Sequence, residues 1–414
     1  MGGRAAILLV LGFSAIFLAM GNNLLRFSGR SADNFVDYYR ETLAYNIAVS
    51  GANMASNEIY IDKTWMTGYS NINFDGGTID VNIDTVGELK QITSTGSYDG
   101  ISHTVQVLLQ PSYFSKFGNY YNSMSAAPAT GDTFHGPFHV NGKLYTYGSP
   151  VFWGKVTSKT GLTMYWSKDP QFYGGYETGI DIPLEFDTTG MRSNAGKVFN
   201  DTTNSGKGIN VRLYFNDDGT VTHSYNAAGD TSWSVPVTED INALSTNGVI
   251  YVEKGNIYTK GKVNGSVTIV ATGKGSSSYG YVYQVGNLEY NDDPRTNADS
   301  EDILGIVAER HIRLQYNDET KGKDIVTQAS MFSLLGNIGP DDNLINQSFL
   351  GRWKILGGLI AANTRQTAEY KLVSGSYVPY KGLQFVHTYD SRFMSYVPPE
   401  FPHTRFYEVL SWYE

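Results

Sequence analysis

The chain has 414 residues, enough for one to three domains. Its 40 acidic and 31 basic residues give a formal net charge of −9, which argues against nucleic-acid binding through a general basic surface. The sequence contains no cysteine, which excludes disulfides, thiolate metal sites and cysteine nucleophiles. The 45 glycines and 30 tyrosines, against only 13 prolines, predict many short strands joined by tight turns.

A long apolar segment follows the first few residues. Residues 5–25, AAILLVLGFSAIFLAMGNNLL, contain no charged side chain, and as a helix rising ~1.5 Å per residue they would span about 30 Å, the thickness of a bilayer core. The alternative is a cleavable secretory signal. However, the run exceeds the usual ~7–15 apolar residues of such signals, and no A-x-A-type cleavage site follows it. The small residues Gly12, Ser14 and Gly21 would let membrane helices approach closely.

The helix is expected to continue without a break, giving one helix over residues 1–62. Beyond residue 31, apolar side chains recur at intervals of three, four or seven with alanines beside them, which is typical of an amphipathic helix with one small-residue face. These positions are Val36, Tyr39, Leu43, Ile47, Met54 and Ile61, with Ala44, Ala48, Ala52 and Ala55. A single-span anchor does not need this second half, whereas a subunit that packs by its helix into a bundle does.

A small antiparallel sheet packed on the helix is predicted for residues 63–130. In residues 78–85, TIDVNIDT, apolar and polar side chains alternate with the period of a half-buried strand. Residues 89–110 contain Tyr98-Asp99-Gly100, a hairpin-type turn, and alternate again beyond it. The sequence therefore predicts a short meander laid on the helix.

The region 131–395 is predicted to form a right-handed parallel β-helix. Short apolar stretches separated by Gly or Asn are too short for sandwich strands, and coils of roughly 20 residues would give each stretch a parallel neighbour above and below. A β-sandwich is the alternative. Residues 160–240, with the turn Asn216-Asp217-Asp218-Gly219, are expected to be an insertion or longer loops, and residues 396–414 a C-terminal tail. The predicted fold class is mainly β with one long N-terminal α-helix.

Two groups of side chains are candidate metal ligands. His135 and His139 are four positions apart, which on a strand places them ~13 Å apart, too far to share one metal; buried or rim histidines are the alternative interpretation, and His103 and His311 lie elsewhere. Residues 291–302, NDDPRTNADSED, form an oxygen-rich loop that suits either Ca²⁺ or a solvated turn, although its spacing does not match an EF-hand. The Ca²⁺ candidates are Asp292, Asp293, Asp299, Glu301 and Asp302.

No pattern of residues predicts an enzyme. The G-x-S-x-G, Walker A and G-x-G-x-x-G motifs are absent, and residues 148–155, GSPVFWGK, have the wrong spacing for a phosphate-binding loop. A β-helix acting on polysaccharide needs two carboxylates across a cleft, and sequence spacing does not reveal such a pair. Trp153, Trp166 and Trp233 would form a carbohydrate- or partner-binding surface or, more ordinarily, cross-strand packing. We predict no catalytic residues and no cofactor beyond the Ca²⁺ candidates.

The segment 1–62 resembles the start of type IV pilin-like proteins. The resemblance lies in the Gly-Arg start followed by AAILLVLGFSAIFLAMG and in the continuation RETLAYNIAVSGANMASNEIY, and it is strongest to minor pilins and to tip pseudopilins of type II secretion systems. In that family the helix anchors the precursor in the inner membrane and then forms the filament core. Most pilins carry a Glu a few residues into the apolar stretch. This span has none, which in the family goes with minor or tip subunits.

Later segments, among them HGPFHVNGKLYTYGSPVFWGKVT and YDSRFMSYVPPEFP, resemble large bacterial pilin-like proteins that carry a β-helix. The resemblance implies a structural subunit of a cell-surface filament, assembled with copies of itself or related pilins, whose head attaches to a glycan or another surface ligand. The alternatives are a membrane-tethered β-helix enzyme acting on polysaccharide and a tip pseudopilin. Arg4 is expected at the membrane or processing boundary. The residues expected to pack in the filament core are Leu8, Leu9, Leu11, Phe13, Ile16, Phe17 and Leu18.

Overall fold

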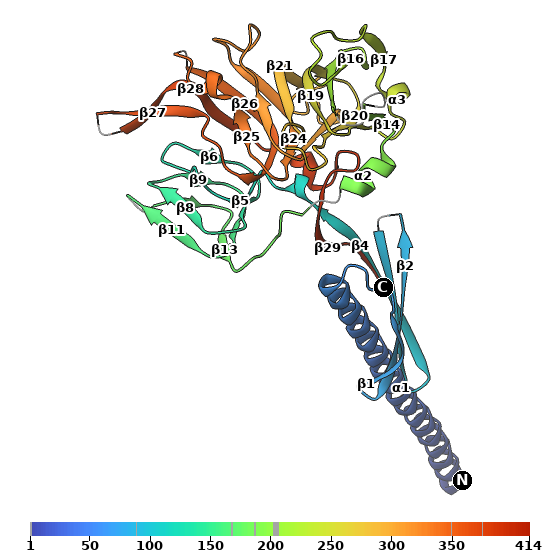
Figure 1. Cartoon of the computed structure of the whole chain (residues 1–414). Helices are drawn as coiled ribbons and strands as arrows, with labels where there is room; N and C mark the ends of the chain where they lie inside the picture. Colours follow the sequence, from blue (N-terminus) through green and yellow to red (C-terminus); the bar gives the residue numbers. More distant parts are fainter. Residues whose placement is uncertain are drawn as a thin grey trace. The chain divides into compact units, whose positions relative to one another are not determined.

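A long helix, α1 (Gly2–Ile61), comes first, and strands make up most of the elements after it (Figure 1). The computed structural model describes residues 2–87, 89–166, 169–185, 188–201, 207–348, 350–374 and 376–414. Contacts divide the chain into two units. The helix–sheet unit comprises Met1–Pro111 and Phe406–Glu414, and the β unit comprises Ser112–Arg405. The predicted long helix followed by a mainly β remainder is confirmed.

The helix–sheet unit contains α1 and a sheet with the strand order β1-β2-β3-β4-β29. Strands β1 to β4 pair antiparallel in sequence order, which confirms the predicted meander. The turn between β3 and β4 has positive φ at Asp99 (46°) and Gly100 (82°), as a two-residue hairpin turn requires. The strand bounds are β1 Tyr69–Phe74, β2 Gly77–Val86, β3 Leu89–Tyr98, β4 Ile101–Tyr113 and β29 His403–Tyr413.

The second half of α1 packs on this sheet through its small-residue face. Ile47 and Ile59 are buried, and so are the alanines at 44, 48, 52 and 55, against Ile79 and Val81 of β2 and further apolar residues of β3 and β4. The sheet comes so close that a Cβ on Gly96 would stand 2.3 Å from the Ala44 carbonyl oxygen. The amphipathic pattern seen in the sequence is therefore the pattern of an internal core.

The β unit begins with short strands that pair in parallel with strands before and after them in the chain. Val156 of β10 pairs with Phe138 of the earlier strand β7 on one side and with Tyr176 of the later strand β13 on the other. Strands β8 and β11 pair in the same way, as do β6, β9 and β12. The bounds are β5 Asn119–Ser123, β6 Thr133–Phe134, β7 Phe138–Val140, β8 Leu144–Tyr147, β9 Val151–Phe152, β10 Val156–Ser158, β11 Leu162–Tyr165, β12 Gln171–Phe172 and β13 Tyr176–Thr178.

A second group of strands in the β unit continues this parallel pairing. Strand β18 pairs with β20, β20 with β22, β22 with β24, and β24 with β26, all in parallel. The bounds are β14 Lys197–Phe199, β15 Ile209–Phe215, β16 Thr220–Ala227, β17 Val237–Asp240, β18 Val249–Val252, β19 Gly255–Val263, β20 Ser266–Ala271, β21 Val282–Tyr290, β22 Ile303–Ala308, β23 Ile312–Leu314, β24 Ile325–Ser333, β25 Ile338–Pro340, β26 Leu350–Asn363, β27 Ala368–Val373 and β28 Ser376–Thr388; the short helices are α2 Thr188–Asn194, α3 Ile241–Leu244 and α4 Asp342–Ile345, with 3₁₀ turns at Phe114–Lys116 and Ser391–Met394.

Antiparallel pairing in the β unit includes two places where the chain turns back on itself. Strands β15, β16 and β17 form a meander within the predicted insertion 160–240, and its first turn is the predicted Asn216-Asp217-Asp218-Gly219. Strands β27 and β28 form the other hairpin. A large, mostly parallel sheet is thus confirmed, whereas the right-handed β-helix stays a prediction.

Strand β26 joins the two groups of strands. Its first half, from Leu350 to Leu356, pairs with β28, and its second half, from Leu359, pairs with β5. The change of partner falls at Gly357-Gly358. Gly357 has φ 143°, and a Cβ there would stand 1.9 Å from the Ala329 carbonyl oxygen, so no other residue fits this position without a shift of the backbone.

Candidate functional site

The first half of α1 presents an apolar surface that the described part of the chain leaves uncovered. By length and composition α1 could cross a membrane, and its most apolar stretch is not buried. Arg4 is exposed at its start. The predicted packing residues all lie on this surface with exposed fractions from 53% (Phe13) to 79% (Leu18): Leu8, Leu9, Leu11, Phe13, Ile16, Phe17 and Leu18. Full burial of one such side chain is worth ~1.5–3 kcal/mol. Their role in assembly stays a prediction.

In the acidic loop 291–302, two carboxylates accept hydrogen bonds from other groups of the protein. Asp302 accepts backbone N–H groups from Gly265 (2.6 Å) and Asp292 (2.7 Å). Asp293 accepts from the Arg295 guanidinium, and this hydrogen bond lowers the pKa of the Asp293 carboxyl to about 2. Asp299 and Glu301 are exposed. Within the described ranges no three His, Asp or Glu side chains are grouped as a metal would need, so the structure does not bring the five Ca²⁺ candidates together.

The candidate histidines lie in separate surroundings. His139 is buried in β7, where its Nδ1 lies 2.7 Å from Thr157 Oγ1, and burial lowers its pKa to about 4. His135 is exposed after β6, with its ring stacked on Trp153. His103 packs edge-on against Tyr45, and His311 Nδ1 accepts the Asn337 N–H at 3.0 Å. These contacts are those of packing and hydrogen-bonding histidines.

The three tryptophans pack against other side chains, and residues 148–155 include a strand. Trp153 stacks on Tyr173 with 4.5 Å between ring centroids, and Trp233 lies under the Arg212 guanidinium at 3.7 Å. Trp166 stands 5.0 Å from the Tyr147 ring. Residues 148–155 contain strand β9 rather than a turn into a helix, so they do not form a phosphate-binding loop.

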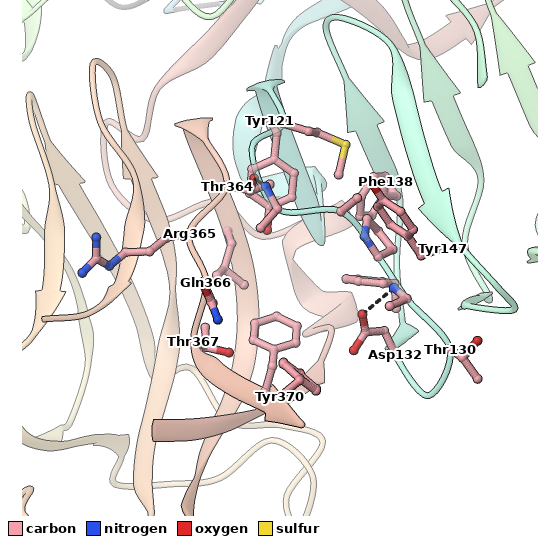
Figure 2. A pocket seen from close by; sticks show the side chains of 18 of the residues that line it. Tyr121, Thr130, Asp132, Phe138, Tyr147, Thr364, Arg365, Gln366, Thr367 and Tyr370 are labelled. Atoms are coloured by element: carbon pink, nitrogen blue, oxygen red, sulfur yellow. Dashed lines mark hydrogen bonds between the residues drawn. The ribbon is translucent and has the colours of Figure 1, made fainter. Parts of the chain in front are cut away.

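A pocket inside the β unit was not anticipated from the sequence. Its volume is about 460 Å³, and it lies between residues 121–166 and residues 338–385 (Figure 2). Tyr121 of β5, Phe138 of β7 and Tyr147 of β8 line one side, and Trp353 of β26, Tyr370 of β27 and Phe385 of β28 line the other. No motif marks it, because its two walls come from segments that are far apart in the chain.

Asp132 is the acidic residue in the described lining of this pocket. Its Oδ2 accepts the Ala129 N–H at 2.7 Å, and burial raises the pKa of its carboxyl to about 6. In Figure 2 it faces Tyr370 across the pocket. Desolvation and then the charge of Asp132 raise the pKa of Tyr370 to about 12. One carboxylate does not make the pair that glycoside hydrolysis needs, so the pocket lends no support to the polysaccharide-enzyme alternative.

Comparison with known proteins gives little to add to this geometry. No protein-family model matches the sequence, and no curated protein matches it. Among solved structures, the competence-associated pilin ComZ from Thermus thermophilus is similar over 90% of this chain and 97% of that chain, with 12% sequence identity and a TM-score of 0.33. At that identity and TM-score the similarity fixes neither the fold family nor the function.

Proposed function

We propose that this chain is a pilin-like structural subunit of a cell-surface filament, in which the first half of α1 packs among the helices of other subunits. One observation carries the proposal: the uncharged run at the start of α1, residues 5–25, is exposed, while the same helix buries its second half on its own sheet. Before assembly the exposed run would lie in the inner membrane, whose core it is long enough to span.

The composition of the exposed run supports packing between helices as well as contact with lipid. Gly12 and Gly21 lie in it, and a Cβ built on either would meet nothing within 4 Å apart from its chain neighbours and the adjacent backbone of the same helix. Glycines on a membrane helix let a second helix approach closely. The absence of a carboxylate between residues 5 and 25 favours a minor or tip subunit over a major one, and the tip pseudopilin of a secretion system is the alternative.

For residues 131–395 we propose a parallel β-helix head that is displayed on the filament and serves in attachment. The parallel registers that join Phe138, Val156 and Tyr176, at nearly even spacing along the chain, support coiling. Aromatic rings stacked from one coil to the next, such as Trp153 on Tyr173, are what such a column would produce on its outer face.

The test is incorporation of full-length variants into surface filaments, measured on sheared fibres by immunoblot and by electron microscopy. Leu11→Lys places a charge in the middle of the run, where it costs ~2.5–3.5 kcal/mol in a bilayer, and should abolish incorporation. Gly12→Leu keeps the run apolar, so the chain should still reach the membrane fraction but incorporate poorly. Val235→Lys, at a residue of the β unit that is 83% exposed, is the matched control.

Three outcomes are informative: one overturns the proposal and two separate the alternatives. Normal incorporation of both Leu11→Lys and Gly12→Leu would overturn the proposal, because neither charge nor bulk on the exposed run would then matter for assembly. Long fibres that contain the chain would identify a pilus subunit, whereas short assemblies confined to the cell envelope would identify a pseudopilin.

A further inference from the structure

We propose that the pocket between residues 121–166 and 338–385 binds an organic cation: an ammonium group carried on an apolar chain or ring. The inference is independent of filament assembly, because every residue that carries it belongs to the β unit. It rests on the walls of the pocket, on its carboxylate, and on the way its other polar groups are already used.

The walls suit a cation with an apolar body. A volume of about 460 Å³ is within the range of small-molecule sites, ~300–1,000 Å³. Aromatic rings of both segments line the pocket, among them Tyr121 and Phe138 of the first and Trp353 and Phe385 of the second. The faces of such rings attract an ammonium group, and this attraction strengthens as water is excluded. An apolar chain or ring attached to the ammonium would fill the remaining space.

The carboxylate of Asp132 has no balancing cation among the described residues. Some other buried or partly buried carboxylates of the β unit are paired, Asp324 with Arg352 and Lys354, and Asp390 with Arg392, whereas Asp302 accepts backbone N–H groups as Asp132 does. Around Asp132 the described residues provide one backbone N–H, from Ala129, and no ion pair. A partly buried carboxylate inside an aromatic pocket, without an ion pair among the described residues, favours a ligand that brings the positive charge.

The basic residue of the lining is turned away from the pocket. Arg365 donates from Nε to the Pro340 carbonyl (2.7 Å) and pairs through its terminal nitrogen with Asp342 (2.7 Å). Figure 2 shows its guanidinium pointing away from the rings. Among the described lining residues, the Arg365 guanidinium therefore does not neutralise the carboxylate of Asp132 inside the pocket.

Three of the remaining polar groups of the lining are already hydrogen-bonded to the protein, which leaves fewer groups for a neutral sugar. Thr364 Oγ1 accepts the N–H groups of Ser125 and Ala126, and Gln366 Nε2 donates to the Ala368 carbonyl. Trp353 Nε1 donates to Thr327. A sugar needs several free donors and acceptors around its ring, whereas one carboxylate among aromatic faces matches an ammonium group.

The experiment measures binding of phenethylamine to the full-length chain in lipid nanodiscs by calorimetry and tryptophan fluorescence, with empty nanodiscs subtracted. Phenethyl alcohol is the neutral probe of equal shape, and methyl glucoside is the sugar probe. The amine should bind best. Asp132→Asn keeps an acceptor for the Ala129 N–H but removes the charge, and should weaken amine binding by about tenfold or more without changing the alcohol. Asp318→Asn, at an exposed carboxylate in the same unit, is the matched control.

The pH dependence gives a second readout that a folding defect would not mimic. Asp132 faces Tyr370 of β27, and the Arg365 guanidinium is held by Asp342. Because the carboxyl of Asp132 has a pKa of about 6 and Tyr370 stays neutral, amine affinity should fall as the pH is lowered from about 7.5 to about 5, while alcohol affinity stays constant.

Three results would overturn the proposal: equal binding of the amine and the alcohol, tighter binding of methyl glucoside, or an unchanged amine affinity in Asp132→Asn. The source of the ammonium is tested with Nα-acetyl-lysine methylamide. If this probe binds more tightly than phenethylamine, the ligand is a lysine side chain; the reverse order indicates a free amine. Both results support the cation site.

Discussion

The two halves of helix α1 are continuous in backbone and opposite in surroundings. From residue 5 to 25 the apolar side chains are exposed on all sides, whereas Ile47 and Ile59 are buried completely on the sheet of the same unit. The first half is also the more apolar, and its apolar positions surround the helix, whereas those of the second half form one face. A one-sided pattern finds its partner within the chain, and an all-round pattern needs partners outside it.

The sharpest way to test this comparison uses two glycines. A Cβ on Gly96, under the second half of α1, would stand 2.3 Å from the Ala44 carbonyl oxygen and 2.4 Å from the Ala48 nitrogen, whereas a Cβ on Gly12 meets nothing within 4 Å. Gly96→Ala should lower the free energy of unfolding by about 1–3 kcal/mol, because helix and sheet must move apart. Gly12→Ala should not lower it. Thermal unfolding of the full chain in detergent, followed by circular dichroism, measures both. Equal effects would show that the two halves are packed alike.

A smaller effect is expected from the hydrogen bond that links the sheet to the helix backbone. Ser94 Oγ donates to the Ala48 carbonyl at 2.7 Å, and Ser94 is buried. Ser94→Ala removes the donor and should lower the free energy of unfolding by about 1 kcal/mol. The exposed Ser102→Ala on the neighbouring strand serves as the control in the same denaturation experiment. A loss below that of the control would mean that the helix is held by apolar contacts alone.

The smallest effect is expected at Arg40, which lies between the exposed first half of α1 and its buried second half. Arg40 pairs with Asp99 at 2.6 Å, but the two side chains are 37% and 59% exposed. Arg40→Gln should therefore change the free energy of unfolding by at most about 0.5 kcal/mol, and high salt should abolish even this difference. Unfolding at low and high salt measures it. A change of several kcal/mol would place the start of the packed half earlier in the helix than the buried alanines do.

The elements set by local pattern could be predicted from the sequence. The spacing of Ala44, Ala48, Ala52 and Ala55 predicted the face that meets the sheet, and Tyr98-Asp99-Gly100 predicted the turn between β3 and β4. Both depend on interactions between near neighbours in the chain, which residue spacing encodes directly.

The features set by distant pairing could not be predicted. Asp132 and Tyr370 meet in the pocket although they are far apart in the chain, because parallel pairing of β26 with β5 brings their segments together. For the loop 291–302 the sequence left Ca²⁺ and a solvated turn open, and it did not reveal that Asp302 accepts the N–H of Gly265, which lies between β19 and β20. Residue types alone do not reveal which distant segments of the chain lie side by side.

Strand β26 has a mechanical consequence. Because its first half is hydrogen-bonded to β28 and its second half to β5, it is shared by both groups of strands. A pulling force applied to either group is transmitted along one backbone into the other, and separating them requires rupture of several ladder bonds at once rather than the opening of a linker. The change of partner at Gly357-Gly358 lies within this shared backbone.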